Sequence, residues 1–102
     1  MMSKAEIRII NVLSMAARKI EERIEEYEKD NRSYNYYKAL DPAHNIIIEL
    51  DKQRIHIKEL KDANNMVSDE FESKISDLRK KCIELESYIL NLGSSAKHVH
   101  VV

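Results

Sequence analysis

The chain has almost none of the residues that punctuate turns. Its 102 residues include one glycine, one proline and no tryptophan. A β-sandwich or β-barrel needs a turn signal about every 8–12 residues, and this sequence has too few of them. Charged residues make up 34% of the chain and apolar residues 43%, a balance typical of long helices and coiled coils. The predicted fold class is therefore all-α.

Cysteine, excess charge and long apolar runs are also scarce. The single cysteine, Cys82, has no second cysteine for an internal disulfide, which indicates a reducing, cytoplasmic compartment. The 17 basic residues are balanced by 18 acidic ones, so the strongly basic face of a nucleic-acid binder is not expected. No run approaches the roughly 18 apolar residues of a membrane span. We therefore expect a soluble intracellular protein with no membrane partner.

The first third of the chain has the pattern of one amphipathic helix. Ser3 and Glu6 have the spacing of a capping box, in which each side chain accepts a hydrogen bond from the other residue's backbone N–H. Apolar residues then recur in steps of three and four: Ile10, Leu13, Ala17, Ile20, Ile24 and Tyr27. The sequence predicts a helix over about residues 3–30.

The next helix is bounded by the single proline and the single glycine of the chain. Asp41 followed by Pro42 is typical of a helix start, since the carboxylate accepts free N–H groups and proline needs no donor there. Gly93 is the expected residue after the last turn. These signals predict a loop over about 31–41 and a second helix over about 42–92. They also predict one helical domain over 1–93 and a C-terminal tail over 94–102.

A second apolar stripe runs along this predicted helix. Its first half comprises Ile46, Leu50, Gln53, Ile57 and Leu60. As one helix of about 50 residues it would extend about 75 Å, whereas the first helix would extend only about 42 Å. Half of the stripe would then have no partner within the chain, which indicates self-association. The expected oligomer interface comprises Asn64, Val67, Phe71, Ile75, Leu78, Cys82, Leu85, Ile89 and Leu92.

The alternative is a turn near Asn64-Asn65, which would give a compact three-helix bundle. Against the turn, neither glycine nor proline is present there, and the spacing continues in phase through Leu60, Asn64 and Val67. The favoured prediction is therefore an antiparallel helical hairpin whose long second helix forms a coiled-coil oligomer, probed best by its mass in solution. A seam asparagine often sets the register and number of strands in such an oligomer.

Motifs for catalysis and for cofactors are missing from the sequence. One glycine cannot build a phosphate-binding loop, and neither G-x-S-x-G nor H-E-x-x-H occurs. His98 and His100 supply two imidazoles, fewer than the three or four ligands that zinc requires. Cys82 on the apolar stripe is interpreted as a small buried hydrophobe. We expect no enzymatic activity, no cofactor and no metal.

Four of the five tyrosines lie between residues 27 and 37, close to two cations. The partner-binding candidates there are Arg32, Tyr34, Tyr36, Tyr37 and Lys38. These side chains suit closure of the bundle end, contact with a protein, or stacking on a nucleotide or single strand. The predicted function is a non-enzymatic helical protein that self-associates and binds an unidentified protein as an adaptor, assembly factor or small inhibitor. The alternative is a nucleotide or single-stranded nucleic-acid binder using residues 31–38.

Overall fold

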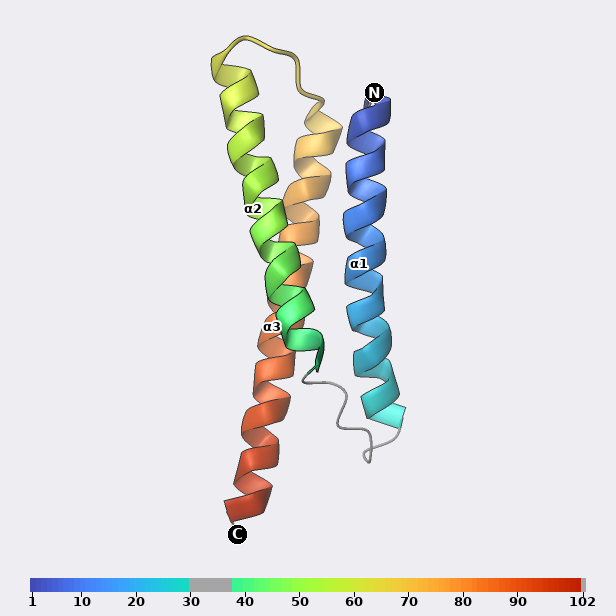
Figure 1. The fold of residues 1–102 in the computed structure, drawn as a ribbon, viewed down its shortest axis with the longest axis vertical. Helices are drawn as coiled ribbons and strands as arrows, with labels where there is room; N and C mark the ends of the chain where they lie inside the picture. The colour runs from blue at the N-terminus through green and yellow to red at the C-terminus, as the bar shows by residue number, and fades with distance from the viewer. Residues whose placement is uncertain (30–37, 102) are drawn as a thin grey trace.

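The described residues form three helices, which pack as a bundle in which each runs opposite to the next. The computed structural model describes residues 1–29 and 38–101, with side chains described as far as Leu92. Its helices are α1 (Lys4–Lys29), α2 (Leu40–Asp62) and α3 (Asp69–Val101). Figure 1 shows α1 and α3 running in the same direction and α2 in the opposite one. The all-α class is confirmed, and so is the alternative of a three-helix bundle.

The start of α1 follows the predicted capping box. The backbone N–H of Ser3 donates to Glu6 Oε1 over 2.8 Å, and the N–H of Glu6 donates to Ser3 Oγ over 3.2 Å. Two of the free N–H groups at the helix start are thereby satisfied. The inward face of α1 is the predicted stripe, with Ile10, Ala17 and Ile20 among its buried residues.

The prediction of one continuous helix over 42–92 is wrong, because the chain turns between α2 and α3. Asn64 has a φ of 60°, and its N–H donates to the Lys61 carbonyl over 3.0 Å. The N–H of Asn65 donates to the Leu60 carbonyl over 2.8 Å. This pair of bonds is a Schellman motif, with asparagine in the left-handed position that glycine usually takes. A serine then starts α3, since Ser68 Oγ accepts from the Phe71 N–H over 3.4 Å.

The apolar stripe that was predicted to form an oligomer lies in the core of the single chain. Phe71, Ile75, Cys82 and Ile89 are buried, and Val67, Leu78, Leu85 and Leu92 pack half-buried against them. The rest of the core comes from the other helices and the residue before α2: Ile10, Ala17, Ile20, Ile24, Ala39, Ala43, Ile46, Leu50 and Ile57. Because the chain folds back at Asn64, its own helices cover this stripe. The stripe therefore has its partner within the chain, and self-association through residues 42–92 is no longer expected.

Both predicted boundaries of the later helices also need correction. Ala39 precedes α2 with helical φ and ψ and no side-chain cap, so the helix begins before Asp41, and Pro42 lies in its first turn. Proline is tolerated there because the first N–H groups of a helix have no partner within the helix. At the other end, α3 passes through Gly93 and reaches Val101 instead of ending before a tail. Glycine costs only about 1 kcal/mol relative to alanine within a helix, and the residues after it contain no proline.

Candidate interaction surface

The contact between α2 and α3 is the largest of the three helix–helix contacts, and polar pairs cross it at regular intervals. His44 Nδ1 lies 3.2 Å from Glu86 Oε2, and Arg79 Nε donates to Asp51 Oδ1 over 2.7 Å. Lys61 Nζ lies 2.7 Å from Glu72 Oε2. The partners on α3, at positions 72, 79 and 86, are spaced seven residues apart. This heptad spacing aligns the two helices along their whole shared length.

The contact between α2 and α3 also shifts the pKa of a lysine side chain. The hydrogen bond and charge of Glu72 raise the pKa of Lys61 above its ordinary value. Lys61 and its neighbour Arg54 line a groove of about 890 Å³ between α2 and α3. Arg54 Nη1 is itself 3.6 Å from Asp51 Oδ1. Two of the three cations that line this groove, Arg54 and Lys61, therefore face carboxylates of their own chain.

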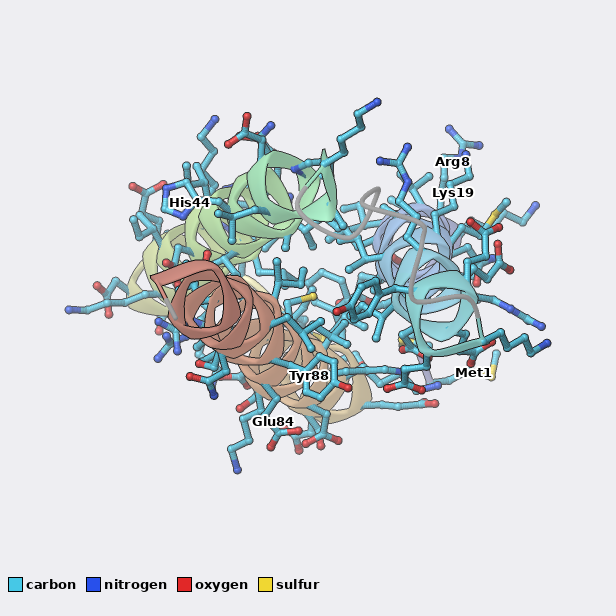
Figure 2. The ribbon with its side chains drawn as sticks, turned by 90° about the horizontal axis from the view of Figure 1, so that it is seen from below. Met1, Arg8, Lys19, His44, Glu84 and Tyr88 are labelled. Carbon is cyan, nitrogen blue, oxygen red and sulfur yellow. The ribbon has the colours of Figure 1, made fainter. Side chains whose placement is uncertain are left out.

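Glutamates of α1 make the polar contacts to α3. Glu21 Oε1 pairs with Lys81 Nζ at 2.5 Å, and Tyr88 Oη donates to Glu28 Oε1 over 2.6 Å. This hydrogen bond raises the pKa of Tyr88. In Figure 2 the ring of Tyr88 extends from α3 toward α1. These contacts lie on the side of α1 that faces α3. The opposite side of α1 is therefore the one exposed to solvent.

Glu6 joins the two helix starts at the other end of the bundle. Its Oε1 belongs to the capping box of α1, and its Oε2 accepts from the Ser68 N–H over 3.3 Å. A single carboxylate thus contacts the residues that immediately precede both helices. An acidic group is favoured at this place, because a helix N-terminus carries a partial positive charge.

The cysteine belongs to the core. Cys82 is fully buried, and this burial raises the pKa of its thiol. A buried neutral thiol is a poor nucleophile, since the thiolate is the reactive form. The interpretation of Cys82 as a small buried hydrophobe is confirmed.

The tyrosine-rich segment contributes little to the described surface. Arg32, Tyr34, Tyr36 and Tyr37 lie outside the described residues. Lys38 is described, and it is exposed in the turn that leads into α2. Binding of a nucleotide or a single strand through residues 31–38 therefore stays a prediction.

The described part of the chain holds neither a cluster of metal ligands nor a membrane-crossing helix. Among these residues, no three His, Cys, Asp or Glu side chains lie close enough together to share a metal ion. Across residues 1–29 and 38–101, no helix combines the length with the hydropathy of a membrane-crossing segment.

A second stripe on α1, which the sequence reasoning missed, faces solvent. We call it the outer stripe, and its residues are Arg8, Val12, Met15, Lys19, Glu22 and Glu26. All six are exposed, including Val12 at 60% and Met15 at 64%. Figure 2 shows Arg8 and Lys19 projecting from the same side of α1, away from α3. The signal was available in the sequence, because these residues also recur in steps of four and three.

The outward face of α2 also carries apolar residues, with a different pattern of charge. Ile48 and Ile55 are 41% and 61% exposed, and Lys52 lies between them. Acidic residues lie at both ends of this face, at Asp41 and Asp62. On α1, by contrast, the cations of the outer stripe precede its carboxylates. The two faces therefore offer similar apolar exposure with different electrostatics.

Comparison with protein-family models, with curated proteins and with solved structures gives no match to this chain.

Proposed function

We propose that this protein acts without catalysis, by binding other proteins as an adaptor, assembly factor or small inhibitor. The binding surface in this proposal is the outer stripe of α1. The observation that carries it is that α1 has two stripes of helical period, one buried in the core and one exposed. The first stripe is accounted for by folding of the single chain, and the second is not.

The composition of the outer stripe supports a protein partner. Val12 and Met15 are adjacent on the helix surface and are bordered by charges of both signs. An apolar centre with a charged rim is the usual anatomy of a protein interface. Methionine also adapts its shape readily to a partner surface. An isolated exposed apolar residue needs no explanation, but two at helical spacing in such a setting favour binding.

The experiment that tests this function is site-specific photo-crosslinking in cells that make the full chain. A photoreactive phenylalanine analogue replaces Val12, and in a matched control it replaces Ile55 on α2, which is exposed to the same extent. We expect crosslinked products of discrete mass from position 12 only. Adding Met15→Glu should remove them, because a buried carboxylate without a partner opposes binding. Equal products from both positions, or none from position 12, would contradict the proposal.

A further inference from the structure

The charges of the outer stripe complement the same stripe read in the opposite direction. Its first residue is Arg8, the apolar Val12 and Met15 follow, and after Lys19 it ends with Glu22 and Glu26. Lys4 extends the positive end by one more turn. We propose that the outer stripe binds a second copy of this chain, with the two α1 helices antiparallel in a two-fold symmetric dimer. This inference rests on the proposed function and deepens it by naming the partner.

Met15 defines the register of the pair. With Met15 on the two-fold axis, Arg8 lies seven residues before the centre and Glu22 seven residues after it. Lys4 and Glu26 lie eleven residues before and after it. An antiparallel pair therefore places Arg8 opposite Glu22 and Lys4 opposite Glu26, and symmetry repeats each contact. The thioethers of the two Met15 side chains meet at the centre, with Val12 beside them.

Two other pairings of the exposed helix faces bring like charges together. A parallel pair of α1 helices places Arg8 opposite Arg8 and Glu22 opposite Glu22, which is repulsive. An antiparallel pair of α2 helices centred between Ile48 and Ile55 places Asp41 opposite Asp62. The antiparallel pair of α1 helices avoids both conflicts.

The charged groups of the outer stripe are accessible in the single chain. Glu22 contacts Arg18 at 3.7 Å, and the two side chains are 60% and 81% exposed. An exposed ion pair within one helix contributes little stability. Little free energy is therefore lost when Glu22 leaves Arg18 and pairs with an arginine of the second copy. Arg18 then lies beside Val12 of the second copy, where its aliphatic stem covers the apolar centre.

Charge reversal at two positions tests the inference on the purified full chain. The molar mass is measured by light scattering behind a sizing column across a range of concentrations. We expect a dimer for the natural sequence. Arg8→Glu and Glu22→Arg should each raise its dissociation constant about tenfold or more, since each places like charges opposite each other twice.

A mixture of the two variants gives the decisive test of the proposed dimer. In a one-to-one mixture of Arg8→Glu and Glu22→Arg chains, every facing pair has opposite charge. The mixture should form a dimer at concentrations where each variant alone is a monomer. The double variant, with both reversals in one chain, should restore self-association for the same reason.

Matched variants separate loss of binding from loss of folding. Met15→Glu should dissociate the dimer, whereas Ile55→Glu on α2 should leave it intact. Circular dichroism should show the same helix content in both, because both positions are exposed. A monomer for the natural sequence at every concentration, or a dimer insensitive to both charge reversals, would overturn the inference.

The two proposals can fail separately. Crosslinks from position 12 to a different protein, together with a purified chain that stays monomeric, would refute the second copy as partner and leave the proposed function standing. Absence of both the crosslinks and the dimer would refute both. Crosslinks to a second copy that disappear with Arg8→Glu would support both.

Discussion

The α2–α3 hairpin and α1 differ in what their surfaces do. The hairpin has the larger helix contact, a short hydrogen-bonded turn and three polar pairs across it. α1 has a buried stripe that packs on the hairpin and a second stripe whose residues are all exposed. The three polar pairs of the hairpin thus lie between its own two helices, whereas α1 packs on the hairpin with one face and carries on the other the outer stripe that we propose as an interaction surface.

Core truncations in the two regions give the strongest test of this difference. Ile75 on α3 is fully buried and Ile20 on α1 nearly so. Truncating either to alanine should lower the free energy of unfolding by about 2–5 kcal/mol, measured by urea denaturation. In hydrogen exchange, Ile75→Ala should expose amides of all three helices, whereas Ile20→Ala should act mainly on α1. Identical exchange patterns would show that the three helices open as one unit.

The turn of the hairpin should be sensitive to residue shape. Asn64→Val forces a β-branched residue into a left-handed conformation and should cost about 1–2 kcal/mol of stability. Asn64→Gly should be neutral or slightly stabilising, because glycine has no steric penalty there. Thermal melts of the two variants measure the difference. Equal stability of both would contradict the role assigned to the Asn64 backbone.

The contact of Glu6 with α3 can be separated from its capping role. Ser3→Ala removes part of the cap and should cost about 1 kcal/mol. Glu6→Ala removes the other hydrogen bond of the capping box, from the Ser3 N–H, and also leaves the Ser68 N–H without its carboxylate, so it should cost more. Chemical denaturation of both variants gives the difference. If Glu6→Ala costs no more than Ser3→Ala, the contact to Ser68 adds nothing to the docking of α1.

The polar pairs across the hairpin should have the smallest effect. Asp51 and Arg79 are partly exposed, so a double-mutant cycle with Asp51→Asn and Arg79→Met should give a coupling of only about 0.5 kcal/mol. Such a value would mean that the pairs set the alignment of α2 and α3 and that apolar burial supplies the stability. A coupling several times larger would assign the pairs a major energetic role.

The exposed face of α1 was missed for an identifiable reason. The stripe through Ile10 and Ile20 is the more apolar of the two and dominates the sequence pattern of this helix. The outer stripe has the same period, but only two of its six residues are apolar. Its charges are informative only once the structure shows which face of α1 is turned away from the hairpin. The tyrosine-rich segment, which drew attention in the sequence, is mostly outside the described residues.

The sequence by itself determined the helical class, the capping box at Ser3 and Glu6, and which residues of each helix face a core. These features depend on the local spacing of residue types, which can be read directly from the sequence. Only the tertiary structure decided what covers the stripe around Ile75. The apolar spacing continues in phase through Asn64. This spacing is equally compatible with a continuous helix that binds an external partner and with a hairpin whose two helices cover the stripe. The left-handed backbone at Asn64 selects the hairpin. The hairpin buries both halves of the stripe within one chain. The free energy gained from this tertiary burial cannot be read from a local sequence pattern.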